Sequence, residues 1–191
     1  DVRFFAVHDK NDALRGHFYL DLYAREHKRG GAWMDDCMGR KIRANGELQT
    51  PVAYLVCNFN KAVGDQPALF THNEVTTLFH EFGHGIHHML TQIDASAVAG
   101  INGVAWDAVE LPSQFLENWC WQDEALAFIS GHYESGEPLP PELLEKLQAA
   151  KNYQSAMQMV RQLEFAMFDF GLHQSFEEGV DVQAYLDSVR N

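Results

Sequence analysis

The sequence predicts an α+β fold that is mainly α, with a small β-sheet in the N-terminal part and a helical remainder. Two observations support this class. Apolar and polar residues alternate in residues 16–24 and an apolar run fills residues 51–60, which is typical of strands. From residue 71 onward, apolar residues recur at helical spacing behind residues that commonly begin helices. We therefore expect the sheet within residues 1–60 and the helices within residues 70–191.

Length and composition are those of a globular protein. The chain has 191 residues, 46% of them hydrophobic and 21% charged, which is enough for one domain spanning residues 1–191. The formal net charge of −13 argues against binding to nucleic acid and to anionic membrane surfaces. No apolar run approaches the roughly 18 residues of a membrane-spanning helix. Cys37, Cys57 and Cys120 follow no metal-binding spacing, and we expect free buried thiols.

The expected strands lie in the first third of the chain. Residues 3–24 should form a β-hairpin, because an apolar run, a cluster of turn formers and an alternating run follow one another. Asn45-Gly46 is a strong signal for a second hairpin turn. Residues 51–60 form the strongest strand candidate. That strand could lie at a sheet edge, where an extended peptide could pair with it, or inside the sheet.

A long helix should begin after residue 71. Thr71 and Glu74 have the spacing of a capping box, and the helical pattern continues to Leu90. Gly83 and Gly85 inside this helix each cost about 1 kcal/mol of helix propensity. Because glycine has no Cβ, both positions permit another group to approach the helix closely.

Further helices are expected in the C-terminal two-fifths of the chain. Residues 91–104 have no clear period and should form a loop. Asp107 should cap the next helix, with Pro112 near its first turn, where proline is tolerated. Residues 163–170 are apolar around most of the helix, so this segment should be buried. The remaining helical patterns cover residues 141–151, 153–176 and 182–191.

Residues 80–84 read His-Glu-Phe-Gly-His and form the main functional candidate. On a helix, positions i and i+4 differ by about 40° of rotation and roughly 6 Å of rise. His80 and His84 therefore project side by side and could bind one metal ion. Glu81, about 100° further round, could instead take a proton from a water held on that metal. Two imidazoles with an adjacent carboxylate suit metal-assisted peptide hydrolysis, and the ligand types favour one Zn²⁺.

A catalytic zinc also needs a third protein ligand and an open position for water. Glu110 is preferred as the third ligand. It lies at one end of a row of polar residues on one helix face, Glu110, Gln114 and Glu117, and its sequence neighbours are apolar, so an unpaired carboxylate there would be costly. Alternatively, Glu110 could bind no metal and be an ordinary carboxylate in the first turn of a helix, where the helix dipole favours a negative charge. Glu117 and Asp107 could orient a ligand histidine through its other ring nitrogen, or could be plain surface charges. The other candidates downstream are Asp94, His87 and His88.

Several stretches resemble the thimet-oligopeptidase-like zinc metallopeptidases: FHEFGHGIHHML, WDAVELPSQFLENWCW, GHFYLDLYAREHKRGGAWMDD, PVAYLVCNFN and GHYESGEPLP. The resemblance implies that His80 and His84 bind zinc and that Glu81 is the general base. It also implies that Glu110, which precedes LPSQ, is the third ligand. It further implies a mostly helical, zincin-like core whose small sheet has an edge strand that aligns the peptide, and residues 51–60 match that strand.

The family resemblance implies an enzyme that cuts oligopeptides, usually in the cytoplasm. Family members are much longer, so the chain is expected to be a partial catalytic domain. We expect a monomeric zinc-dependent endopeptidase, in which Glu81 takes a proton from the metal-activated water and passes it to the leaving amine. One alternative is a dipeptidyl carboxypeptidase of the same family, which would need a group for the carboxylate of the substrate. The other is a zinc-binding but catalytically silent protein.

Overall fold

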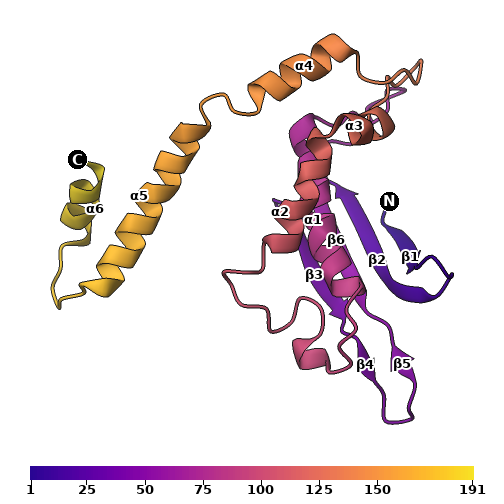
Figure 1. Cartoon of the computed structure of the whole chain (residues 1–191), viewed down its shortest axis with the longest axis horizontal. Helices are drawn as coiled ribbons and strands as arrows, with labels where there is room; N and C mark the ends of the chain where they lie inside the picture. Colours follow the sequence, from indigo (N-terminus) through magenta and orange to yellow (C-terminus); the bar gives the residue numbers. More distant parts are fainter. The chain divides into compact units, whose positions relative to one another are not determined.

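A four-stranded sheet fills the N-terminal part of the chain, with the strand order β1-β2-β6-β3 (Figure 1). The pairs β1–β2 and β3–β6 are antiparallel, whereas β2 and β6 are parallel. The predicted hairpin over residues 3–24 is confirmed, and so is the turn at Asn45-Gly46, where Gly46 has a φ of +83°. The strands are β1 (Arg3–His8), β2 (Leu14–Tyr23), β3 (Trp33–Met38), β4 (Lys41–Ile42), β5 (Leu48–Gln49) and β6 (Val52–Phe59).

Helices make up most of the remainder, which confirms the α+β, mainly α class. The computed structural model describes residues 1–191 and separates into two compact units, Asp1–Leu139 and Pro140–Asn191. None of the helices combines the length and the apolar character that a membrane span requires. The α-helices are α1 (His72–Met89), α2 (Leu111–Glu117), α3 (Asp123–Ile129), α4 (Pro141–Ala150), α5 (Ser155–Gln174) and α6 (Val182–Arg190), and 3₁₀ turns cover Ser96–Val98 and Asn118–Trp121.

β6 lies inside the sheet, between β2 and β3. Of the two placements that the sequence left open for residues 51–60, the interior one is confirmed, and the edge position implied by the family resemblance is wrong. The two edges are β1 and β3. Ala53, Leu55 and Cys57 of β6 are fully buried. The apolar run reflects this burial in the core, because an interior strand is covered by strands on both sides and here also by a helix on one face.

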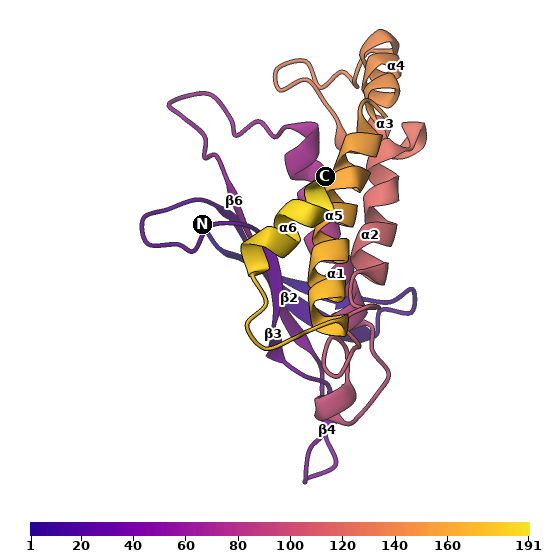
Figure 2. The same cartoon turned by 90° about the vertical axis from the view of Figure 1, so that its left-hand side faces the viewer.

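α1 lies along one face of the sheet, over β6 (Figures 1 and 2). Its predicted capping box is confirmed: the Thr71 Oγ accepts from the Glu74 N–H at 3.2 Å, and the Glu74 Oε2 accepts from the Thr71 N–H at 2.8 Å. Gly85 faces Leu55, where an added Cβ would lie 3.0 Å from the Leu55 Cδ2. The missing side chain therefore allows the helix to pack closely on the central strand.

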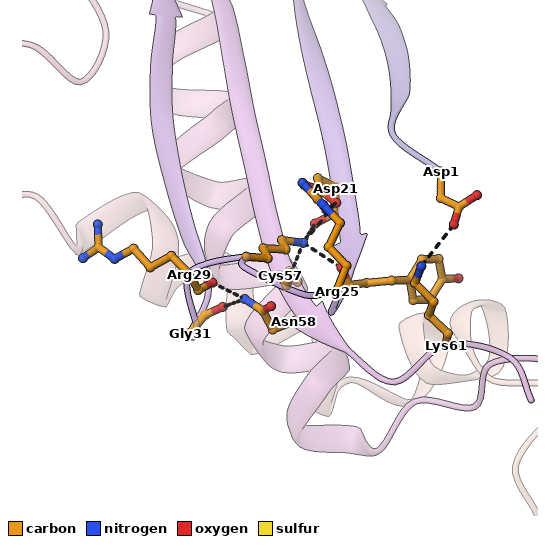
Figure 3. Close-up of polar contacts among 10 residues, drawn as sticks. Asp1, Asp21, Arg25, Arg29, Gly31, Cys57, Asn58 and Lys61 are labelled. Atoms are coloured by element: carbon orange, nitrogen blue, oxygen red, sulfur yellow. Dashed lines mark hydrogen bonds and ion pairs between the residues drawn. The ribbon is translucent and has the colours of Figure 1, made fainter.

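The loop between β2 and β3 is fixed to the sheet by two buried or partly buried side chains (Figure 3). The Lys28 side chain is only 4% exposed, and its ammonium donates to the carbonyls of Tyr23, at 2.9 Å, and Cys57. The Asn58 Nδ2 donates to the Gly31 carbonyl at 2.7 Å. These bonds satisfy backbone carbonyls at the end of the sheet. They also hold the chain where it enters the edge strand β3.

α2 begins three residues later than the sequence predicts. The expectation that Asp107 caps this helix is wrong, because residues 105–110 form turns and Glu110 occupies the N-cap position. Pro112 explains the difference: it has no backbone N–H and fixes its φ, so it is tolerated only in the first turn. The expected loop at residues 91–104 is confirmed, with one short 3₁₀ turn inside it.

The second unit, Pro140–Asn191, contains α4, α5 and α6 near their predicted positions, and Asp181 caps α6 by accepting from the Ala184 N–H at 3.0 Å. The prediction that α5 is buried around residues 163–170 is wrong. Leu163 is 50% exposed and Phe170 is 69% exposed. A helix that is apolar around its circumference needs partners on several sides, whereas α6 covers only one side of α5.

Candidate metal centre

The helical geometry of α1 brings two histidines of the HEFGH stretch together. His80 and His84 are one turn apart, and their ring centroids are separated by 5.0 Å at an interplanar angle of 83°. The His84 side chain is 11% exposed, whereas the His80 side chain is 27% exposed. Both rings point toward the beginning of α2, so this face of α1 presents two imidazole nitrogens to one place.

Glu110 meets both histidines from the N-terminus of α2. The Glu110 Oε2 lies 3.1 Å from the His80 Nε2 and 3.1 Å from the His84 Nε2. The ligand atoms of all three residues lie within 4.8 Å of one another. Ligands of a tetrahedral zinc ion with bonds of 2.0–2.1 Å are about 3.3 Å apart. His80, His84 and Glu110 could therefore hold one metal ion with little rearrangement.

Gly83 explains how α2 comes so close to the two histidines. A Cβ added to Gly83 would lie 2.6 Å from the Pro112 carbonyl oxygen and 2.6 Å from the Ser113 Cα. No real side-chain carbon fits at such a distance from backbone atoms. The glycine between the two histidines thus allows α2 to place Glu110 beside them.

Glu117, at the end of α2, lies behind His80. The Glu117 Oε1 is 2.6 Å from the His80 Nδ1, so the imidazole donates its Nδ1–H to the carboxylate. A neutral His80 then has a lone pair on Nε2, which faces the Glu110 Oε2 at 3.1 Å. Two lone pairs repel each other at that distance unless a proton or a metal cation lies between them. The donor set therefore fits a metal ion, and the carboxylate–histidine pair is the usual support for such a ligand.

The protonation states favoured by the site also suit metal binding. Partial burial raises the pKa of Glu110, but the hydrogen bond from Ser113 and the nearby His84 and His80 outweigh it, so the pKa lies below its usual value. Burial lowers the pKa of His84, and Glu110 offsets this only in part. An ionised carboxylate and a neutral imidazole are the forms that bind a metal.

We call His80, His84 and Glu110 the metal group. Glu81 lies beside the metal group without belonging to it. Its side chain is buried, with 6% exposure, and burial is the main reason why its pKa is raised. His80 and a hydrogen bond from the Met34 backbone lower the pKa in part. Met34 belongs to β3, and α1 packs against that edge strand. A carboxylate whose pKa is raised by burial accepts a proton more readily than an exposed carboxylate does.

The other sequence candidates lie outside the metal group. Asp94 pairs with Arg40 at 2.7 Å. His88 is fully buried, and its Nε2 donates to the Met38 carbonyl at 3.0 Å, so it links α1 to β3. Asp107 and His87 are likewise not among the three residues whose ligand atoms come together.

Sequence reasoning missed one residue of the site. Ser113 is fully buried, and its Oγ lies 2.7 Å from the Glu110 Oε2. The available signal is the spacing, because a side chain three residues after Glu110 can face it across the first turn of a helix. Whether the Ser113 hydroxyl reaches the Glu110 carboxylate, however, depends on where α2 begins.

Comparison with known proteins gives consistent results. Residues 1–191 match peptidase family M3. Oligopeptidase A of Haemophilus influenzae is 75% identical over 177 residues, which cover 93% of this chain and 26% of the relative. The proteins of the same name from Salmonella typhimurium and Escherichia coli are 71% and 66% identical, and each alignment covers 100% of this chain and 28% of the relative.

The chain spans about a quarter of the length of these relatives. The alignments with the Salmonella typhimurium and Escherichia coli proteins cover the whole chain, and therefore include the sheet, α1, α2 and the helices of the second unit. The family resemblance of the sequence is thereby confirmed, and the chain belongs to peptidase family M3.

Proposed function

We propose that this chain carries the zinc-binding core of a metalloendopeptidase that hydrolyses short peptides. The observation that carries the proposal is the meeting of His80, His84 and Glu110 at distances suited to one ion, with Glu117 behind His80. Two imidazoles and a carboxylate favour Zn²⁺ over harder cations, which prefer oxygen ligands only. When bound, zinc would polarise a peptide carbonyl and lower the pKa of a coordinated water.

Glu81 is the proposed general base. Its carboxylate takes a proton from the attacking water and passes the proton to the amine that leaves. Its burial supports this role, because a desolvated carboxylate holds a proton more readily than an exposed one. Its position in the sequence also supports it, since Glu81 follows His80 directly and lies beside the metal group rather than within it.

β3 is the proposed strand along which a substrate peptide lies. It forms one edge of the sheet, so one side of its backbone is not paired with another strand. α1, which carries His80, Glu81 and His84, packs against this edge strand. An extended peptide paired with β3 would gain main-chain hydrogen bonds and present a carbonyl to the site. β3 thus takes the role that the family resemblance assigned to residues 51–60.

Two fluorescence-quenched peptides of the same sequence test the proposed activity, one with a free and one with an amidated C-terminus. We expect the zinc-loaded chain to cleave both, to lose the activity on chelation and to regain it when zinc is added. Cleavage of the free peptide only would favour the dipeptidyl carboxypeptidase. Cleavage of neither peptide by zinc-loaded protein would favour the silent zinc-binding protein and contradict the proposal.

Glu117→Gln is expected to weaken zinc binding by about 10–100-fold, because the amide cannot hold the His80 imidazole as the carboxylate does. The measurement is competition with a chromophoric chelator of known affinity. Glu124→Gln, on the exposed first turn of α3, removes the same charge away from the site and should leave the affinity unchanged. An unchanged affinity for the Glu117 variant would exclude this supporting role.

Several other expectations stay predictions. They are a single domain over residues 1–191, a monomeric state and a cytoplasmic location. The net charge of −13 remains the reason to expect no binding to nucleic acid or to anionic membranes.

A further inference from the structure

Ser113 contacts Glu110 at two atoms while being shielded from solvent. The Ser113 Oγ lies 2.7 Å from the Glu110 Oε2 and 2.9 Å from the Glu110 carbonyl oxygen. Its side chain has no exposed surface. A buried hydroxyl normally has a hydrogen-bond partner, and both candidates here belong to the same residue.

The hydroxyl has one proton, and the geometry indicates which oxygen receives it. The Glu110 carbonyl already accepts the backbone N–H of Gln114 at 2.9 Å, as the first hydrogen bond of α2 requires. The carboxylate oxygen is closer to the Ser113 Oγ and carries charge, so it is the stronger acceptor. Ser113 therefore donates to the Glu110 Oε2.

The same carboxylate oxygen faces both histidines, at 3.1 Å from each Nε2. The Glu110 side chain is otherwise 49% exposed, and a free glutamate side chain at a helix terminus would sample several rotamers. The hydrogen bond from Ser113 removes this freedom and directs Oε2 toward His80 and His84.

The backbone of Ser113 is also held in place. Gly83 of α1 lies directly against it, because an added Cβ at Gly83 would come within 2.6 Å of the Ser113 Cα. Ser113 cannot move toward α1, and its hydroxyl stays under the carboxylate. The contact between the two helices thus supports the one side chain that orients the third ligand.

We propose that Ser113 is a positioning residue that holds the Glu110 Oε2 in the metal group and thereby sets the affinity for zinc. The proposal rests on the proposed zinc site and adds a residue to it. It differs from a purely structural role of Ser113 in the first turn of α2. A structural role would alter the stability of the helix, and its effect on zinc would not depend on the presence of Glu110.

The first measurement compares Ser113→Ala with the unaltered chain in a chelator competition with Zn²⁺. We expect about 10–100-fold weaker binding, which is typical when a group that orients a metal ligand is lost. Ser130→Ala is the matched control, because the Ser130 hydroxyl also donates to a neighbouring group, the Leu126 carbonyl, but lies outside the metal group. This control should bind zinc as the unaltered chain does, and the metal-free forms of both variants should unfold at similar temperatures.

The second measurement repeats Ser113→Ala in a chain that also carries Glu110→Ala. If Ser113 acts through Glu110, its removal weakens zinc binding no further in this background. An equal loss of affinity with and without Glu110, or unchanged affinity of the single Ser113 variant, would overturn the proposal. Failure of the unaltered chain to bind zinc would instead refute the zinc site itself, so the two failures are distinguishable.

Discussion

Glu81→Gln is expected to abolish peptide hydrolysis while zinc binding is retained. The amide has the size of the carboxylate but cannot accept the proton of the attacking water, and general-base catalysis contributes about 10²–10⁴-fold to the rate. His80, His84 and Glu110 remain in place, because Glu81 is not part of the metal group. The measurements are kcat with a fluorescence-quenched peptide and the zinc content of the same sample.

Glu74→Gln is the matched control on the same helix. Glu74 closes the capping box with Thr71, and glutamine is accepted at this position, so both structure and activity should be kept. Retention of more than about a tenth of the activity by the Glu81 variant would contradict its role as general base. Loss of zinc from that variant would show that Glu81 takes part in metal binding instead.

Gly83→Ala is expected to lower both the stability of the protein and its affinity for zinc. Alanine favours the helix by about 1 kcal/mol. The new Cβ, however, would lie 2.6 Å from the Pro112 oxygen and the Ser113 Cα, which are backbone atoms and cannot rotate away. Overpacking of this kind costs about 1–3 kcal/mol or more, so the clash exceeds the gain in propensity. α2 must move, and Glu110 moves with it.

Two other glycines serve as controls for Gly83→Ala. Gly30 has no atom within 4 Å of an added Cβ and no positive φ, so alanine there should be tolerated. Gly85→Ala tests the same helix, but its nearest obstacle is the Leu55 Cδ2 at 3.0 Å, a side-chain atom that can adjust. Urea denaturation and zinc titration should rank the Gly83 variant as the most affected. Unchanged values for that variant would show that the helix contact does not position the ligand.

Local sequence patterns predicted the part of the site that lies on one helix. His80 and His84 meet because of helical periodicity alone, and Thr71 and Glu74 mark where that helix begins. The metal group brings Glu110 to the two histidines from a separate helix. Spacing in the sequence made Glu110 a preference among several carboxylates, and the family resemblance singled it out.

The predictions that failed depended on tertiary partners. The apolar pattern of residues 51–60 shows that the strand is buried, but it does not show that β3 completes the sheet on its other side. The pattern of α5 likewise reports how much of its surface is apolar and not which element covers it. The hydrogen bond from Ser113 to Glu110 depends on where α2 begins and on a side-chain rotamer. The spacing of apolar residues in the sequence predicts neither of these.

The number of Zn²⁺ ions that the initially metal-free chain binds tests the central proposal most directly. We predict that titration with Zn²⁺ against a chromophoric chelator gives one tightly bound equivalent, as a single His-His-Glu site requires. His84→Ala should weaken this binding by at least about 100-fold, since one of three protein ligands is lost. Binding of less than about 0.2 equivalents by the unaltered chain, or undiminished binding by the His84 variant, would contradict the proposed site.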